Sequence, residues 1–187
     1  SKVDFRFGSN QEFKSLVADA HANNINVLLD YVAHHVHKEH PFYKQHPEWT
    51  TPLYLPDGSL NTERWDDQRL TTWFDTFMPT LDLSNPKVVD MMTDSAMYWL
   101  REFKLDGFRH DACKHITEQF WRELTLKIKQ ANQGKNLYQI GETYGSPELI
   151  SSYLNTGMLD GQFDFNVYDV ANTAFAGVGG SDLQKVQ

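Results

Sequence analysis

Two carboxylates are the residues of this sequence best suited to do chemistry. Asp111 and Glu142 each follow a short apolar run, at the point where the sequence turns polar, and the cationic Arg109 stands two positions before Asp111. In glycoside hydrolysis one carboxylate attacks or stabilises the sugar carbon while the other transfers the proton. The pair therefore indicates a glycosidase, provided that the fold brings the two residues together.

The elements before Asp111 can be predicted from capping signals and periodicity. A helix is predicted over residues 10–23, because Ser9 and Glu12 have the spacing of a capping box and apolar residues follow at helical intervals. The apolar run Ile25–Ala33 is too short for a second helix and is typical of a buried strand in a parallel sheet.

Regular patterns return in the second half of the chain. Asn85 followed by Pro86 is typical of a helix start, and apolar residues on one helical face extend this helix to Phe103. The other predicted elements are strands at residues 105–108, 137–140 and 163–167, a helix capped by Thr117 and a helix over residues 146–154. Helices that alternate with strands in this way indicate parallel βα units.

Polar residues gather where the predicted strands end. Asp30 lies in the first strand with His35 just after it, Asp111 follows the second strand and Glu142 follows the third. In folds built from parallel βα units, chemistry is concentrated at the carboxyl ends of the strands, where the loops converge. We therefore expect these side chains to meet at one rim of the sheet.

Periodicity is absent from about residue 34 to residue 80, where prolines and aromatic residues are scattered. A connection this long inside a compact domain is usually a functional insertion. Its tryptophans and tyrosines could stack on sugar rings, but an insertion also needs a core of its own. We expect one or two of these rings at a cleft and the rest inside.

Composition narrows the classes of partner. The formal net charge is -8 and no basic stripe is present, which argues against nucleic acid and anionic membranes as partners. No apolar run approaches the roughly 18 residues needed to span a bilayer, so a soluble protein is expected. Cys113 is the only cysteine, so no internal disulfide is expected, and the compartment (secreted, periplasmic or cytoplasmic) stays open.

Four segments resemble, in order and spacing, signature regions of the α-amylase family, glycoside hydrolase family 13. They are Asp30–His35, Met78–Asp82, Gly107–His115 and Gly141–Thr143. The second is most similar to the neopullulanase and cyclomaltodextrinase branch of that family. One such motif would be weak evidence, but four in order, spread over nearly the whole chain, are strong evidence.

The resemblance implies an α/β fold, a segment of a (β/α)8 TIM barrel comprising about strands 3 to 6, with a small irregular domain inserted after strand 3. Residues 1–34 would be a first part of the barrel, residues 35–80 the inserted domain and residues 81–187 a second part of the barrel. Only about four of the eight βα units of a barrel of about 250 residues are recognisable, so we expect a central fragment of a catalytic domain.

The resemblance also implies a retaining mechanism on α-linked glucans such as starch, maltodextrin, cyclodextrin or pullulan. Asp111 would be the nucleophile, and Glu142 would protonate the leaving oxygen and later activate water. Arg109 would hold the nucleophile ionised. Glu142 would need a raised pKa, which partial burial and the charge of Asp111 would supply.

Further residues are implied on the substrate side. His35 matches a histidine that contacts the sugar in the cleavage subsite, and Lys114 and His115 match positions on the acceptor side. Tyr144, two residues after Glu142, and Asp30 complete the expected substrate-binding set, with Asp30 favoured as a support of the rim.

Two features depart from the family pattern. His34 stands where the family commonly has an asparagine that helps to bind structural calcium, and calcium prefers oxygen ligands. Calcium is therefore open but disfavoured, and no metal or cofactor is expected to be required. The family's third carboxylate has no counterpart before Gln187, which leaves the activity of the isolated chain open. Because an incomplete barrel exposes apolar strand edges, the isolated chain is expected to be poorly stable, oligomeric or dependent on missing residues.

Two other interpretations stay open. One is a non-catalytic carbohydrate-binding or scaffold relative, which the intact set of Arg109, Asp111, Glu142 and His35 disfavours. The other is a metal-dependent barrel hydrolase that uses the histidine-rich stretch of residues 34–46, although no cysteine pair or HExxH motif accompanies those histidines. The preferred partner is an α-glucan, and a homo-oligomer is left open.

Overall fold

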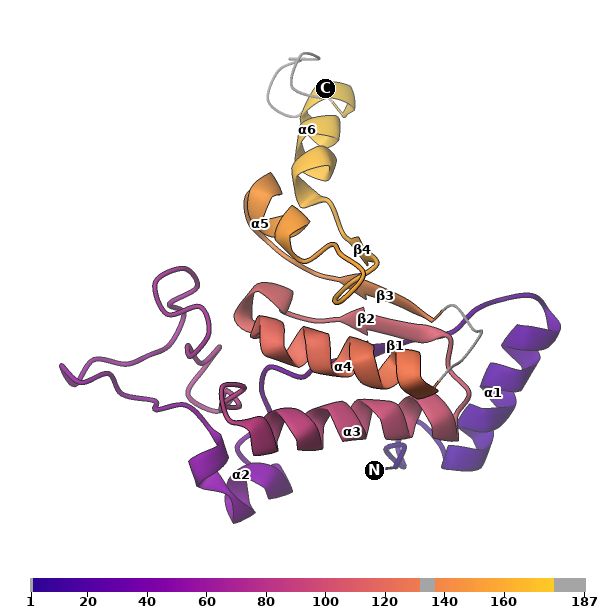
Figure 1. Ribbon diagram of the computed structural model, residues 1–187, viewed down its shortest axis with the longest axis horizontal. Coiled ribbons are helices and arrows are strands. Elements are labelled where there is room, and N and C mark those ends of the chain that lie inside the picture. The colour runs from indigo at the N-terminus through magenta and orange to yellow at the C-terminus, as the bar shows by residue number, and fades with distance from the viewer. Residues whose placement is uncertain (1, 132–136, 177–187) are drawn as a thin grey trace.

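The computed structural model describes residues 2–131 and 137–176, and these contain a parallel sheet with helices between its strands (Figure 1). The strands are β1 (Leu28–Tyr31), β2 (Gly107–His110), β3 (Tyr138–Gly141) and β4 (Gly161–Gln162), and they lie in the order β1-β2-β3-β4. The helices are α1 (Asn10–Ala22), α2 (Pro41–Gln45), α3 (Pro86–Glu102), α4 (Glu118–Ala131), α5 (Pro147–Ser152) and α6 (Phe165–Phe175), with short 3-10 turns η1 (Pro47–Trp49) and η2 (Cys113–His115). All three strand pairs are parallel, so the predicted βα order is confirmed.

The predicted helix starts are confirmed in detail. Ser9 Oγ accepts a hydrogen bond from the Glu12 backbone N–H, and Glu12 Oε2 accepts one from the Ser9 N–H at 2.8 Å, which is the capping box of α1. The side chain of Asn85 accepts a hydrogen bond from the Lys87 N–H, and Pro86 occupies the first turn of α3. The local sequence was sufficient to specify where α1 and α3 begin.

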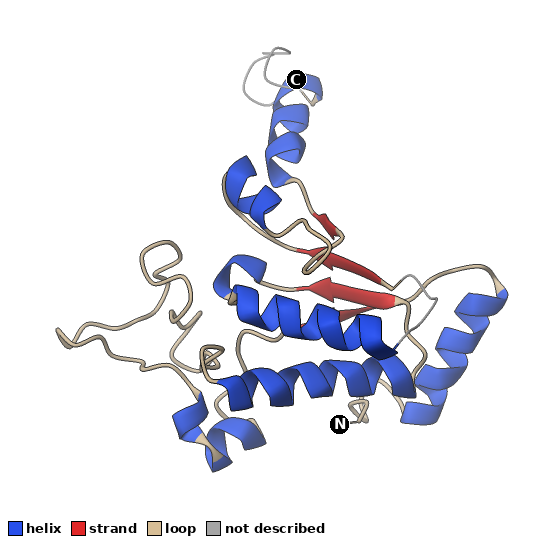
Figure 2. Ribbon diagram, in the orientation of Figure 1, coloured by secondary structure: helices blue, strands red, loops and turns tan. Residues whose placement is uncertain are grey.

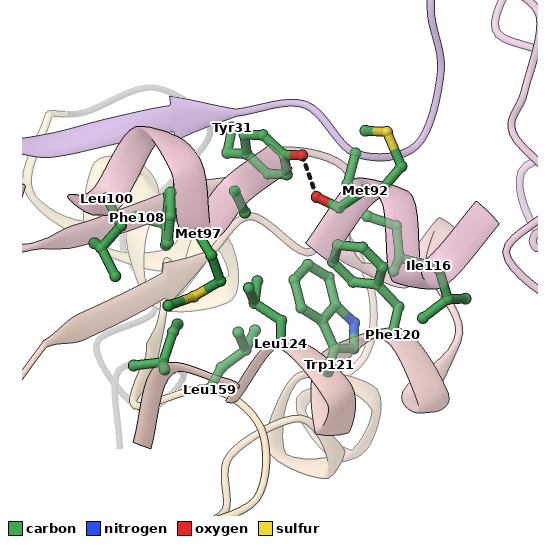
Figure 3. Packing of buried hydrophobic residues seen from close by; sticks show 14 of the residues in the cluster. Tyr31, Met92, Met97, Leu100, Phe108, Ile116, Phe120, Trp121, Leu124 and Leu159 are labelled. Carbon is green, nitrogen blue, oxygen red and sulfur yellow. Dashed lines mark hydrogen bonds between the residues drawn. The ribbon is translucent and has the colours of Figure 1, made fainter. Parts of the chain in front are cut away.

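One face of the sheet is buried beneath α3 and α4, and this is where the core lies (Figure 3). Phe108 of β2 packs there against Trp121 and Leu124 of α4 and Met97 of α3. Tyr31 of β1 joins this core, and its hydroxyl donates a hydrogen bond to a backbone carbonyl of α3, that of Met92, at 2.7 Å. Each buried polar group of this kind needs such a partner, because an unpaired one costs about 1–3 kcal/mol.

The opposite face of the sheet is open. Side chains alternate between the two faces of a strand, so Leu28 and Asp30 of β1 project away from the core that Tyr31 enters. Tyr138 is aligned with Leu28 through the strand register and is 47% exposed. The polar residues at the strand ends belong to this open face.

The segment between β1 and α3 is mostly loop, as Figure 2 shows, although it contains the short helix α2, which the absence of periodicity did not predict. Its two ends meet, because His35 pairs with Thr80 and the Leu81 N–H donates to the His34 carbonyl at 2.8 Å. The division into residues 1–34, 35–80 and 81–187 stays a prediction, and residues 177–187 lie outside the described ranges.

The strand predicted over residues 163–167 is wrong. β4 covers only Gly161–Gln162, and Phe165 already begins α6. Asp164 caps this helix, with its Oδ1 accepting from the Val167 N–H at 3.0 Å. A short apolar run cannot be assigned to helix or strand by periodicity alone, and here the cap decided the outcome. Within the described ranges, none of the helices combines the length and the apolarity that crossing a membrane requires.

Candidate active site

Arg109 stands at the centre of the polar rim. Its Nη1 donates hydrogen bonds to Asp111 Oδ1 at 2.7 Å and to Asp30 Oδ1 at 2.9 Å, and its Nη2 donates to Glu142 Oε2. One guanidinium thus binds three carboxylates, from the ends of three neighbouring strands. The predicted meeting of these four side chains is present in the structure.

The strand register explains why they meet. Arg109 is aligned with Asp30 on one side and with Ile140 on the other. Side chains two residues apart on a strand share a face, so Asp111 and Glu142 extend the same face beyond Arg109 and Ile140. The spacing visible in the sequence therefore becomes a cluster only because β1, β2 and β3 are parallel and in this register.

The electrostatics separate the roles of the carboxyl groups. Partial burial raises the pKa of Glu142, a hydrogen bond with Asp111 raises it further, and the positive charge of Arg109 opposes both effects. Burial by itself lowers the pKa of Arg109, but the hydrogen bonds with Asp111 and Asp30 outweigh it, so the pKa of the guanidinium is raised overall. Glu142 is thus favoured to hold its proton to a higher pH than a free glutamate does, and Arg109 stays cationic.

The backbone after β2 and β3 holds the pair in place. Ala112, directly after Asp111, has a φ of 52°, in the left-handed region, and this turns the chain into η2. The Cys113 N–H donates to the Glu142 carbonyl at 2.9 Å, and the Glu142 N–H donates to the His110 carbonyl at 2.9 Å. The two loops that carry Asp111 and Glu142 are therefore tied to each other by main-chain hydrogen bonds.

A cluster of rings lies on the insertion side of the site. His34, His35 and His115 surround Phe74 with ring-centre distances of 4.6, 4.9 and 5.1 Å. Burial lowers the pKa of His35, and the nearby charge of Asp111 opposes this shift. His35 is thus close enough to Asp111 for the charge of the carboxylate to affect its pKa. Phe74, which lies between the histidines, belongs to the insertion. The structure brings His35 and His115 together around Phe74, a residue that the sequence did not single out.

The other predicted substrate-side residues lie at the edges of the site. Lys114 Nζ lies 3.3 Å from Asp66 Oδ1, and the lysine side chain is 14% exposed. Tyr144 is 62% exposed, and its ring stacks on Phe165 at 4.8 Å, so its recorded partner belongs to α6. Within the described residues, no hydrogen bond or ion pair joins Lys114, His115 or Tyr144 to the cluster of Asp30, Arg109, Asp111 and Glu142.

The surroundings of His34 do not fit a calcium ion. The side chain is fully buried, its Nε2 has no hydrogen-bond partner, and its nearest ring neighbours are His35, Phe74 and His115. Calcium prefers oxygen ligands, which none of these neighbours provides. Across residues 2–131 and 137–176, no group of three or more histidine, cysteine, aspartate or glutamate residues is arranged to hold a metal ion. The metal-dependent alternative has no ligand set in this part of the chain.

Residues of the insertion were the main omission of the sequence analysis. Arg69 and Asp66 both contact η2, and Trp65 packs against His115 at 5.7 Å. Trp65 had been considered only as one of several aromatic residues of the segment, and it is 36% exposed, whereas Trp73 is buried. No periodic or spacing signal marks Arg69, because its partners are distant in sequence.

Comparisons with known proteins agree with the fold. The family model for the alpha amylase catalytic domain matches residues 1–186. A cyclomaltodextrinase from a Bacillus species is 27% identical over 190 residues, a match that covers 91% of this chain and 32% of that enzyme. A cyclomaltodextrinase from Geobacillus thermopakistaniensis is 29% identical over 189 residues, covering 94% of this chain and 30% of that enzyme.

Solved structures give the same result. The crystal structure of the alpha-amylase from Geobacillus thermoleovorans, complexed with acarbose, matches with a TM-score of 0.80 and 30% identity, and covers 94% of this chain and 38% of that chain. The predicted barrel segment is thereby confirmed. This chain spans about a third of the length of the relatives that it matches.

Proposed function

This chain belongs to the α-amylase family, and from that premise we propose that Asp111 and Glu142 are the catalytic pair of a retaining glycoside hydrolase that cleaves α-linked glucans. The observation that carries the proposal is the single guanidinium of Arg109, which binds both carboxylates at the carboxyl ends of neighbouring strands. A structural ion pair at the surface requires only one carboxylate beside the guanidinium, whereas a double-displacement reaction requires two carboxylates close together.

The spacing of the two carboxyl groups supports retention of configuration. An inverting pair is separated by about 6.5–9.5 Å, which leaves room for the attacking water, whereas a retaining pair is about 5–5.5 Å apart. Asp111 and Glu142 bind the Nη1 and Nη2 atoms of one guanidinium, and an interaction with Asp111 contributes to the raised pKa of Glu142. Two carboxyl groups held by the same guanidinium lie close together, which favours the shorter, retaining separation.

The roles follow from the electrostatics. Arg109 holds Oδ1 of Asp111 and so orients that carboxylate for attack on the anomeric carbon. The raised pKa of Glu142 keeps its proton available for the leaving oxygen as the glycosidic bond breaks. In the second half-reaction Glu142, now ionised, takes a proton from the water that releases the sugar from Asp111, and both residues return to their starting states.

The proposed substrate is an α-glucan such as starch, maltodextrin, cyclodextrin or pullulan. The relatives of this chain include two cyclomaltodextrinases and an alpha-amylase that was solved with acarbose bound. His35 is proposed as a sugar contact because it lies close enough for the charge of Asp111 to affect its pKa, and Lys114 and His115 are proposed because they belong to η2, the turn that follows Asp111. The half-exposed ring of Trp65 adds an aromatic face next to His115.

The test is sugar release from starch, cyclodextrin and pullulan by the wild-type chain and by Asp111→Asn. We expect the substitution to lower activity by at least about 10³-fold, because the covalent intermediate cannot form. Asp19→Asn, an exposed carboxylate on α1, is the matched control and should leave activity unchanged. Absence of activity in the wild-type chain would contradict its being a hydrolase by itself.

Two further measurements separate the roles. Glu142→Gln should lose activity on glucans but still release fluoride from a maltosyl fluoride in the first turnover, because this leaving group needs no protonation. Steady-state turnover of the fluoride should stay low, because the variant also lacks the base of the second half-reaction. The first product of the wild-type chain, followed by NMR, should have the α configuration of the substrate. A β product would refute the retaining mechanism, and absence of the first-turnover fluoride release would refute the role of Glu142 as the acid.

A further inference from the structure

Arg69, from the insertion, is bonded to the turn that follows Asp111. Its Nη1 donates to the Lys114 carbonyl at 2.6 Å and approaches the Tyr153 hydroxyl at 3.4 Å. Its own backbone carbonyl accepts a hydrogen bond from His115 Nδ1 at 2.7 Å. One residue of the insertion therefore holds two consecutive residues of η2 and also reaches the segment after α5.

The turn that Arg69 holds is tied to the carboxylate pair at its other end. It begins at Ala112, whose φ of 52° is unfavourable for a residue with a side chain, and the Cys113 N–H donates to the Glu142 carbonyl at 2.9 Å. A backbone held in this conformation needs support from its surroundings. Arg69 supplies that support at the end of the turn where Lys114 and His115 lie.

Other contacts to Lys114 are too weak to replace Arg69. The ion pair of Lys114 with Asp66 has a separation of 3.3 Å, and the Asp66 side chain is 96% exposed. Exposed pairs of this kind are screened by solvent and contribute little. A charge-assisted hydrogen bond from a half-buried guanidinium to a carbonyl is the stronger restraint on this residue.

The carboxylate pair has supports of its own besides η2. Asp111 and Glu142 are held by Arg109 and by the strands that carry them. Loss of the Arg69 guanidinium therefore disturbs the rim next to the pair and leaves the pair itself in place. This distinction separates an effect on sugar binding from an effect on the chemical step.

We propose that Arg69 is a positioning residue that couples the insertion to the sugar-binding rim, by holding η2 so that Lys114 and His115 face the substrate. The proposal rests on the proposed function, because it assigns a binding role to the residues beside Asp111. Figure 1 shows the loop of the insertion on the side toward which the strands point, where such coupling has to act.

The variant Arg69→Ala removes the guanidinium and keeps the carbonyl that bonds His115, so it tests the side chain alone. Arg69→Lys keeps one cationic donor and should restore part of the effect. The matched control is Arg64→Ala, which removes the same charge from the same segment, since the Arg64 guanidinium pairs with Asp67 at the surface. Arg64→Ala should behave as the wild type does.

The first measurement is the affinity for maltotriose, by calorimetry, in the Glu142→Gln background, where turnover does not interfere. We expect Arg69→Ala to weaken binding about tenfold, the equivalent of one charged hydrogen bond. In the active chain, KM should rise by a similar factor while kcat stays within about threefold. Unchanged affinity, or a fall in kcat with unchanged KM, would overturn the proposal.

The second measurement is amide hydrogen exchange over residues 112–116, which needs neither substrate nor activity. Exchange there should be about tenfold faster in Arg69→Ala than in Arg64→Ala. If the Glu142→Gln chain fails to bind maltotriose, the proposed substrate class is wrong, and the exchange rates alone then decide whether Arg69 holds the turn. Equal exchange rates would overturn the role of Arg69 in either case.

Discussion

Gly141, the last residue of β3, lies where the packing behind the site leaves no room for a side chain. A Cβ atom added there would lie 2.6 Å from Cys113 Sγ, 2.7 Å from Leu159 Cδ1 and 2.9 Å from Gln162 Nε2. Cys113 and Leu159 are at most 1% exposed, so neither can move aside into solvent. We predict that Gly141→Ala destabilises the protein and shifts Glu142, the next residue.

The size of the effect follows from these contacts. Carbon atoms pack at about 3.5–4.0 Å, so an alanine methyl group requires a displacement of about 1 Å in a filled core. Overpacking of this kind costs about 1–3 kcal/mol, and the lower entropy of an unfolded alanine offsets about 0.4–1 kcal/mol of it. A net loss of about 1–2 kcal/mol corresponds to a fall in Tm of about 2–8 °C for a chain of this size.

Thermal and urea unfolding, followed by circular dichroism, measure this loss. Gly157→Ala is the matched control, because its Cβ would meet only the side-chain ends of Arg122 and Asn155, at 3.2 and 3.3 Å. It should change the free energy of unfolding by less than about 0.5 kcal/mol. Combining Gly141→Ala with Cys113→Ala should recover about 1 kcal/mol relative to additivity. A Gly141→Ala variant as stable as Gly157→Ala would refute the packing argument.

Two further predictions concern stability. Burial lowers the pKa of His110 to about 4, whereas the same histidine in the unfolded chain takes up its proton near pH 6.5. The free energy of unfolding should therefore fall as the pH drops from 7 toward 4, and His110 alone should contribute a loss of about 2 kcal/mol at pH 5. NMR titration of the His110 ring checks this, and a pKa near its ordinary value would contradict it. Lys127 of α4 pairs with Asp90 at 2.6 Å and with Asp94 at 2.8 Å, both on α3. Lys127→Met should therefore lower the free energy of unfolding, measured in urea, by about 1 kcal/mol at low salt and by less at about 0.5 M salt. The control Lys87→Met, at an exposed position of α3, should leave it unchanged.

Helix starts and the order of elements could be predicted because their causes are local. The capping box at Ser9 and the proline after Asn85 act within a single turn, so neighbouring residues determine them. Residues 163–167 were assigned to the wrong class because a short apolar run suits both a strand and a helix. There the choice depended on the Asp164 cap and on how few residues β4 contributes to the sheet.

The carboxylate pair could be recognised in the sequence because both signals are local: the residue is an aspartate or a glutamate, and it directly follows a predicted strand. Their convergence on Arg109 also followed, once parallel strands were expected, from the two-residue period of a strand. The sequence thus determined which groups do the proposed chemistry and which face of the sheet they share.

The raised pKa of Glu142 was expected from the family resemblance, but the tertiary structure alone decided the burial that causes it and the contact of Arg69 with η2. The first depends on how much solvent the packed site excludes, which no local pattern records. The second joins residues 45 positions apart through a segment without periodicity. Burial and long-range contacts are properties of the packed chain, so they could be read only after the strands, the turn and the insertion had been placed together.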